Sequence, residues 1–324
     1  SEVAANAPQP RANPHFRGHD DAEAHLRAAF ASGRCPHAWL LCGPRGIGKA
    51  TLAFRFARFV LAQGTGDPAQ PALFGTDDVA EGEGLSVDPD HPVFRRVASG
   101  GHLDFVTVER GPSDQGGKKR SEIVVSDIRA VGAFLRLTPG EGGWRVVVID
   151  SADDMNRNAA NALLKVLEEP SARALLILVS HNPDRLLPTV RSRCRRLGMR
   201  ALTDADVGDL IERYAPGLAT DDHATLTRLS EGSIGRAVVL AEEGGLELYR
   251  ELVALLGTWP RLDTEALHRL GDRLARRGAE DAFRTVGELT RWWLARMIAL
   301  GAAPGGKEVP SLDGTERAIM VRLL

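Results

Sequence analysis

A glycine-rich turn places the strongest constraint on what this chain can fold into. Residues 43–50 agree with the phosphate-loop pattern G-x-x-x-x-G-K-[ST] at seven of its eight positions. An apolar run at 37–42 precedes the turn, and a helix is predicted at 49–63. This order directs backbone N–H groups at a helix N-terminus toward phosphate oxygens. The predicted phosphate cradle consists of Gly43, Pro44, Arg45, Gly46, Ile47, Gly48, Lys49, Ala50 and Thr51.

The end of this turn departs from the pattern at a position that matters for metal binding. Lys49 is expected to reach the outer phosphates, but Ala50 stands where a Ser or Thr hydroxyl normally holds Mg²⁺. Thr51 is one residue further on, and a helix turns by about 100° per residue, so its hydroxyl points elsewhere. We therefore expect phosphate binding, with ATP as the candidate nucleotide, and weakened positioning of the metal.

A second signal ends the clearest predicted strand, 144–150. Four apolar residues lead into Asp150, which stands where a Mg²⁺-bound water is held beside the phosphates. Asp150 is thus the one candidate metal residue, and no metal ligand is assigned with certainty. The next position, usually a Glu that activates the attacking water, is Ser151, which has no carboxylate. Asp153 and Asp154 are expected to cap the following turn.

Strands and helices alternate through the first two thirds of the chain, which predicts an α/β fold. The apolar runs 37–42, 103–109, 144–150 and 174–180 favour a parallel sheet covered on both faces. Helices are predicted at 21–32, 49–63, 123–137 and 158–169, and residues 63–101 are interpreted as an insertion or surface loop. After about residue 199 only helical patterns remain, with boundaries expected near 200 and 245.

Composition excludes several classes of protein. The chain has 41 Lys and Arg against 43 Asp and Glu, and this net charge of −2 excludes a protein that coats nucleic acid with overall positive charge. Three cysteines without paired spacing argue against a disulfide scaffold and a four-cysteine zinc site, and they suit a reducing cytoplasm. No apolar run approaches 18 residues, so no membrane span is expected, and residues 1–17 are interpreted as a flexible lead-in.

Two further motifs carry a specific resemblance. Residues 155–170 read M-N-R-N-A-A-N-A-L-L-K-V-L-E-E-P, and residues 191–194 contain S-R-C. Together with Gly18-His19 and the segment 123–129, they resemble the bacterial clamp-loader AAA+ subunits of DNA polymerase III over about 18–240. The resemblance implies an AAA+ phosphate-loop domain at 18–200, a helical lid at 201–245 and a helical oligomerisation collar at 246–324.

The resemblance also implies roles for single residues. Arg193, in the S-R-C motif, would act in trans on the ATP site of a neighbouring subunit, where a guanidinium suits the charge of a γ-phosphate. Arg236 would contact nucleotide, and a solvated arginine at a helix start is the rival interpretation. Residues 180–182 stand where a polar sensor residue would lie, although a polar turn explains them equally well. Trp292 and its apolar neighbours are expected to be packed core or, preferably, a subunit interface.

The implied partners are the motor (gamma/tau) and delta subunits, the sliding clamp and, through the complex, primed DNA. Ala50 and Ser151 favour a stator member of the family whose own ATPase is absent or slow. Lys49, Asp150 and Arg236 keep a self-contained ATPase of the motor type open as an alternative. A pure interaction module with an inactive nucleotide pocket is the third possibility.

Overall fold

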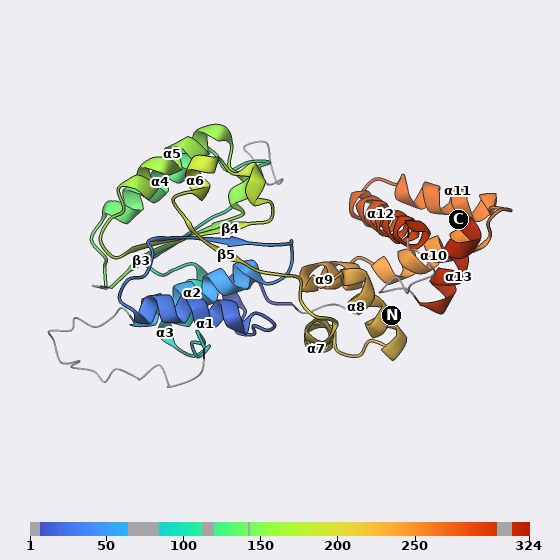
Figure 1. The fold of residues 1–324 in the computed structure, drawn as a ribbon, viewed down its shortest axis with the longest axis horizontal. Coiled ribbons are helices and arrows are strands. Elements are labelled where there is room, and N and C mark those ends of the chain that lie inside the picture. Colours follow the sequence, from blue (N-terminus) through green and yellow to red (C-terminus); the bar gives the residue numbers. More distant parts are fainter. Residues whose placement is uncertain (1–6, 64–83, 112–119, 142, 303–312) are drawn as a thin grey trace. The chain divides into compact units, whose positions relative to one another are not determined.

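The computed structural model describes residues 7–63, 84–111, 120–141, 143–302 and 313–324. Residues 8–201 form one compact unit with a five-stranded sheet, and the chain from residue 202 belongs to a second unit (Figure 1). Within the described ranges, the second unit contains helices and no strand, as the sequence predicts. The α/β fold class followed by a helical region is confirmed. The lid at 201–245 and the collar at 246–324 stay predictions.

The sheet brings three strand ends together at one edge. All neighbouring strands are parallel and their order is β2-β3-β4-β1-β5. Cys42, at the end of β1, lies opposite Ser180 of β4, and Asp150 of β3 lies opposite Val179. The phosphate loop and Asp150 therefore lie at the same edge of the sheet. The strands are β1 (Ala38–Cys42), β2 (Phe105–Val108), β3 (Arg145–Asp150), β4 (Ala174–Ser180) and β5 (Arg195–Gly198).

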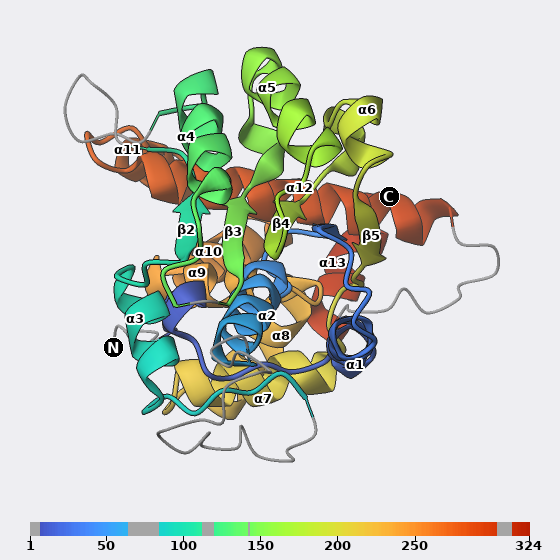
Figure 2. The ribbon, with the colours of Figure 1, turned by 90° about the vertical axis from the view of Figure 1, so that its left-hand side faces the viewer.

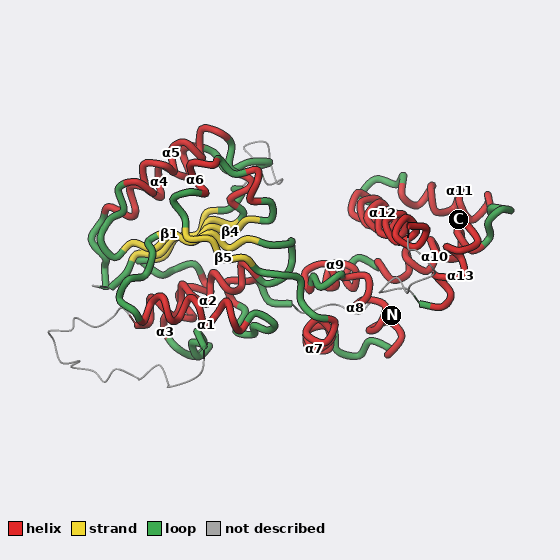
Figure 3. The backbone as a smooth tube through the Cα atoms, in the orientation of Figure 1, coloured by secondary structure: helices red, strands yellow, loops and turns green. Residues whose placement is uncertain are grey.

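Alternate residues of each strand feed two separate cores. Trp39 of β1 packs with Val146 and Val148 of β3 on one face, whereas Leu40 packs with Val147 on the other. Helices α1, α2 and α3 cover the first face and α4, α5 and α6 cover the second (Figures 2 and 3). These helices are α1 (Asp20–Ala31), α2 (Lys49–Gln63), α3 (Pro92–Ser99), α4 (Val125–Arg136), α5 (Arg157–Glu168) and α6 (Pro188–Arg191).

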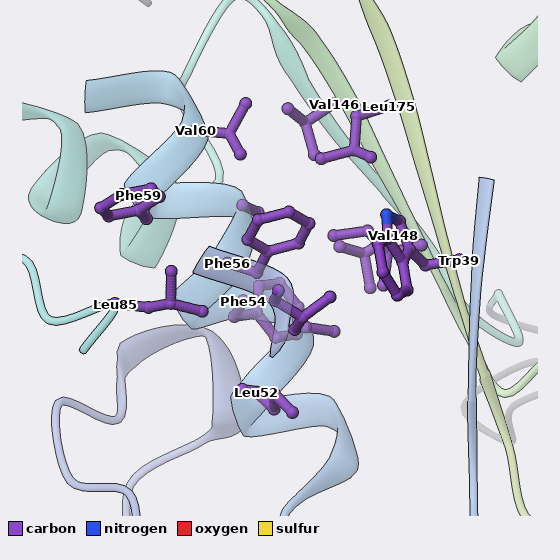
Figure 4. Close-up of a cluster of buried hydrophobic side chains, with 14 of the residues drawn as sticks. Trp39, Leu52, Phe54, Phe56, Phe59, Val60, Leu85, Val146, Val148 and Leu175 are labelled. Carbon is purple, nitrogen blue, oxygen red and sulfur yellow. The ribbon is translucent and has the colours of Figure 1, made fainter. Parts of the chain in front are cut away.

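Helix α2, which begins at the phosphate loop, is anchored along most of its length. Its side chains Leu52, Phe54 and Phe56 are buried in the first core (Figure 4). Its two arginines are also buried, and each has partners. Arg55 pairs with Glu23 of α1 at 2.9 Å, and Arg58 donates to the carbonyl oxygens of Arg11 and Asn13 at 2.8 and 2.9 Å.

The segment 8–19 belongs to the α/β unit and packs against it, whereas the sequence predicts a flexible lead-in at 1–17, of which residues 1–6 lie outside the described residues. It contains a short 3₁₀ helix, Pro10–Ala12, and a buried Asn13. The guanidinium of Arg58 binds two of its carbonyl groups and lies 4.3 Å from the centre of the Phe94 ring. Buried cations of α2 thus hold this segment against the domain, a contact that the sequence pattern of the segment itself does not reveal.

Helices α3 and α6 and strand β5 are not among the elements that the sequence predicts. The predicted loop at 63–101 contains α3, whose Val93, Phe94 and Val97 are buried against the first core; residues 64–83 lie outside the described residues. Pro92 at its start and the left-handed Gly100 at its end are the signals for this helix. Strand β5 was also missed, because its sequence, Arg-Arg-Leu-Gly, is polar and lies at the exposed edge of the sheet.

The helical unit has its own core. Trp292 and Trp293 are buried, and the Trp292 ring lies edge-on to Tyr249 at 6.2 Å between centres. The two indoles therefore belong to the packed core, which is the first of the two interpretations. Leu294 and Ile298 of the same stripe are exposed, and the subunit interface stays a prediction. The unit consists of α7 (Asp204–Tyr214), α8 (Thr220–Ser230), α9 (Ile234–Glu242), α10 (Gly245–Gly257), α11 (Thr264–Leu274), α12 (Glu280–Ala302) and α13 (Gly314–Leu323).

Candidate functional site

The phosphate loop is built on backbone conformations that glycine tolerates. Gly46 and Gly48 have φ values of 77° and 97°. Gly43 has φ 153°, and a Cβ added there would lie 2.3 Å from the carbonyl oxygen of Met199. The loop is also supported from outside, since the carbonyl oxygen of Ile47 accepts a hydrogen bond from His19 Nε2 at 2.9 Å. The predicted strand, glycine turn and helix are thus present in the predicted order.

Lys49 is buried at the start of α2 and is held by the loop itself. Its Nζ donates to the carbonyl oxygen of Gly43 at 2.7 Å and to that of Pro44. Burial lowers the pKa of Lys49 to about 8, and the carboxylates of Asp150 and Asp153 partly oppose this shift. The ammonium group therefore contacts the loop carbonyls, and the charges of Asp150 and Asp153 act on it.

Asp150, at the end of β3, and the next residue, Ser151, form a hydrogen-bonded group with His181, which follows β4. Ser151 Oγ donates to Asp150 Oδ1 at 3.3 Å and lies 2.9 Å from His181 Nε2. Burial raises the pKa of Asp150, while the Ser151 hydrogen bond and Lys49 act in the opposite direction. Burial also lowers the pKa of His181 to about 4, helped by the charge of Lys49, so the imidazole is neutral at pH 7.

The sequence predicts that Asp153 caps the next turn, but its carboxylate has other partners. Its carboxylate accepts hydrogen bonds from Ser180 Oγ at 2.6 Å, from the backbone N–H of His181, and from that of Asn182 at 3.1 Å. Asp153 therefore joins the loop after β3 to the end of β4. It fixes the turn that carries His181, so the polar residues at 180–182 form a structured cluster.

The residues at this edge do not fit the Mg²⁺ ion that accompanies ATP in phosphate-loop proteins. Ala50 supplies no hydroxyl, and Ser151 supplies no carboxylate. The carboxylate of Asp153 is already bonded to three donors. Among the described residues, no group of three or more His, Cys, Asp or Glu side chains is arranged to hold a metal ion. Asp150 is the remaining carboxylate at this end of the sheet, and its role as a candidate metal residue stays a prediction.

Arg193 lies between α6 and β5, on the surface of the first unit. Its Nη2 is 2.8 Å from Glu168 Oε1, and its Nη1 donates to the carbonyl oxygen of Thr189 at 2.9 Å. The side chain is 37% exposed, which leaves the guanidinium accessible to a partner. Glu168 belongs to the L-E-E-P segment, so the two motifs that carry the family resemblance are in contact. The trans role of Arg193 stays a prediction.

Arg236 belongs to the helical unit. It lies in the first turn of α9, where Ser233 Oγ accepts a hydrogen bond from its backbone N–H at 3.2 Å. Its guanidinium pairs with Glu231 at 2.8 Å, and Glu231 also pairs with Arg296 at 2.6 Å. Arg236 thus has an ion pair within its own unit, and its role as a nucleotide contact stays a prediction.

Sequence reasoning found the loop residues and Asp150 but missed the contacts between strand ends. The Ser151–His181 pair and the three hydrogen bonds to Asp153 depend on β3 and β4 being neighbours in the sheet. Polar residues directly after two apolar strands were the available signal. The order of the strands, which decides whether such residues meet, was not predicted.

Comparison with known proteins decides the family. The family model described as "DNA polymerase III, delta subunit" matches residues 18–203. The chain belongs to this family. One similar protein is the DNA polymerase III subunit delta' of Pseudomonas aeruginosa, which is 40% identical over 217 residues. This alignment covers 67% of this chain and 59% of that protein.

Other relatives of this delta-family chain are gamma and tau subunits of DNA polymerase III at lower identity. The tau subunit of Salmonella typhimurium is 26% identical, covering 91% of this chain and 46% of that protein. The chain thus spans about half the length, or somewhat more, of these curated relatives. Among solved structures, a gamma subunit-related protein from Thermotoga maritima matches with 19% identity and a TM-score of 0.42, covering 87% of this chain and 73% of that one.

In the part of the chain that the structure describes, no helix is long and apolar enough to cross a membrane.

Proposed function

We propose that this chain acts as the delta-prime (stator) subunit of a DNA polymerase III clamp loader. In this role it assists ATP-driven loading of the sliding clamp onto primed DNA during replication. Its partners are the motor (gamma/tau) subunits, the delta subunit, the clamp and, through the complex, DNA. The family match and the higher identity to a delta' subunit than to a tau subunit support this assignment.

The observation that carries the proposal is that two groups normally needed for ATP hydrolysis are replaced in this site. The usual metal hydroxyl is replaced by Ala50, and the usual catalytic carboxylate is replaced by Ser151, whose hydroxyl contacts His181. The positive φ values of Gly46 and Gly48 and the contact of Lys49 with the loop support phosphate binding. A chain with this combination is suited to holding nucleotide, whereas its own cleavage of ATP lacks the groups that activate water and orient the metal.

In the complex, this chain contributes Arg193 to the reaction of a neighbour. A guanidinium is charged at every physiological pH and offers several N–H donors to the oxygens of a transferred phosphoryl group. Arg193 is exposed and lies near the surface strand β5, which allows such an approach from another subunit. The chain thereby places a charge at the transition state without hydrolysing ATP itself.

Reconstitution tests this function. The chain is mixed with purified motor and delta subunits, and complex formation and clamp loading on primed DNA are measured with and without it. The proposal expects a stable complex and clamp loading that depends on this chain. Failure to associate with either subunit would exclude the stator role.

The motor-type alternative rests on Lys49, Asp150 and Arg236, and the contacts of Lys49 with the loop and of Asp150 with Ser151 support it. It makes a different prediction for the isolated chain. A steady-state turnover above roughly 1 s⁻¹, within the ordinary range for enzymes, would favour a self-contained ATPase. The stator proposal expects little or no turnover by the purified chain.

A further inference from the structure

We propose that the last described helix, α13, is a strap that holds α8 against α10 in the helical unit. Helix α8 belongs to the predicted lid, and α10 belongs to the predicted collar. The strap acts through one buried carboxylate, Glu316, which lies in the first turn of α13 and contacts both helices. The proposal concerns this chain alone and is independent of its place in a clamp loader.

Helix α13 is attached by few buried side chains, and one of them is charged. Glu316, Ile319 and Met320 are buried, whereas Val321 is exposed. Ile319 and Met320 belong to the same apolar core as side chains of α8 and α10. Apolar contacts have no preferred direction, so helices can shift against one another while these contacts stay covered. A buried carboxylate is more demanding, because it must keep its own partners.

The carboxylate of Glu316 has partners on three elements. Its Oε1 lies 2.7 Å from Nη2 of Arg228 in α8 and also accepts a hydrogen bond from Tyr249 Oη in α10. Its Oε2 accepts a hydrogen bond from the backbone N–H of Asp313 at 3.0 Å, which completes the N-terminal cap of α13. Glu316 is 1% exposed, so this contact is shielded from water. One carboxylate oxygen is therefore shared by donors from α8 and α10.

Arg228 makes a second contact between α8 and the strap. Its Nη1 lies 3.2 Å from Oδ2 of Asp313, so the guanidinium contacts both acidic residues at the start of α13. A direct ion pair between α8 and α10 joins Asp222 to Arg250, but the Arg250 side chain is 57% exposed. Exposed pairs contribute little because water and salt screen them. The link between α8 and α10 therefore depends on Glu316 more than on this surface pair.

Hydrogen exchange of the full chain, followed by mass spectrometry of its peptides, tests the strap. Glu316→Gln removes the charge, keeps the shape and leaves Arg228 without its buried counter-ion. We expect amide exchange to become faster by about tenfold or more in both α13 and α8. Glu288→Gln is the matched control, since it makes the same change at an exposed residue of α12 and should leave exchange in α8 unchanged. Unchanged exchange in α2 shows that the α/β unit stays folded.

The pattern of exchange decides between the outcomes. Faster exchange in α13 alone would overturn the proposal, because α13 would then be attached to the unit without holding α8. Unchanged exchange in both helices would overturn it as well. The double variant Arg228→Gln/Glu316→Gln should exchange no faster in α8 than Glu316→Gln does, since the two side chains form one contact, and additive effects would contradict this.

A second variant keeps the test decisive if Glu316→Gln does not fold. Arg228→Gln alters the strap from the side of α8 and leaves Glu316 bonded to Tyr249. Faster exchange in α13 as well as in α8 supports the strap. Faster exchange in α8 alone would overturn it, because the two helices would then be held independently.

Discussion

At the scale of single residues, the charge of Lys49 links the phosphate loop to the acidic strand ends. Burial lowers its pKa to about 8, whereas Asp150 and Asp153 favour the charged form. Its Nζ donates to loop carbonyl oxygens, and the proposed nucleotide would bring its phosphates to the same loop. A bound polyanion stabilises the ammonium, and binding is therefore coupled to protonation of this one side chain.

This coupling predicts a pH dependence of ATP binding. Below the pKa of about 8 the free amine is already protonated, and above it the amine must take up a proton on binding. Affinity for ATP should therefore weaken as pH rises above 8, by up to about tenfold per pH unit. Calorimetry at several pH values measures this slope. Lys49→Arg keeps its charge throughout and should remove the slope, while an unchanged affinity of the unaltered chain across this range would refute the coupling.

Gly43 gives a prediction for stability. Because an added Cβ would lie 2.3 Å from the Met199 carbonyl oxygen, Gly43→Ala must displace either the loop or the end of β5. We expect a loss of about 1–3 kcal/mol in the free energy of unfolding, together with weaker ATP binding. Gly198→Ala is the matched control, since a Cβ there meets nothing within 4 Å, and it should change stability by less than about 0.5 kcal/mol. Equal denaturation midpoints for the two variants would contradict this account.

Glu168 holds Arg193 in the isolated chain, and this contact is expected to compete with a neighbour's phosphate. An exposed pair of this kind contributes about 0.2–1 kcal/mol. Glu168→Gln should therefore lower the concentration of this chain needed to stimulate the motor subunits by up to about fivefold. Glu169→Gln is the matched control: it makes the same chemical change at the exposed neighbouring residue and should have no effect. A higher required concentration for Glu168→Gln would show that the pair positions Arg193 and does not restrain it.

At the scale of elements, the site depends on how the ends of β3 and β4 are joined. One side chain, Asp153, collects three donors from residues 180–182 and so sets the position of His181. A carboxylate that accepts several hydrogen bonds is difficult to replace, because truncation leaves its donors unpaired. The geometry opposite the phosphate loop is therefore a property of two neighbouring strands.

Replacement of Asp153 tests this joint. Asp153→Ala should lower the free energy of unfolding by about 2–4 kcal/mol, measured by chemical denaturation. The neighbouring Asp154 pairs with Arg110 at 3.1 Å on a more exposed part of the surface. Asp154→Ala should therefore change stability by less than about 1 kcal/mol. A similar loss in both variants would mean that the turn after β4 does not depend on Asp153.

The elements also mark how far the sequence alone predicts the fold. Strands β1, β3 and β4 were predicted because a parallel strand covered on both faces is a continuous apolar run. Helix α3 was missed because its short apolar face is surrounded by residues typical of loops, and β5 because an exposed edge strand needs no apolar run. The phosphate loop was found from local spacing, whereas the pairing of Ser151 with His181 required the strand order.

At the scale of the whole molecule, the residues with proposed functions and the family match lie mostly in the α/β unit, whereas the helical unit is described mainly by its core. The α/β unit contains the phosphate loop, Arg193 and most of the segment that places the chain in its family. The helical unit has a core of its own, formed around residues such as Trp292 and Tyr249. The sequence predicted its helical character but not which residues of α12 are buried, because the stripe of apolar positions contains both buried and exposed members.

The most direct measurement of the central claim is the ATPase activity of the reconstituted complex containing Arg193→Ala. Arg193 lies on the surface, so the variant should fold and assemble as the unaltered chain does. The ATPase should fall, because an arginine that acts in trans contributes about 10³–10⁵ to kcat at the site it serves. Arg195→Ala, which removes an exposed arginine of β5, should leave it unchanged. An intact complex with Arg193→Ala and full ATPase activity would contradict the account.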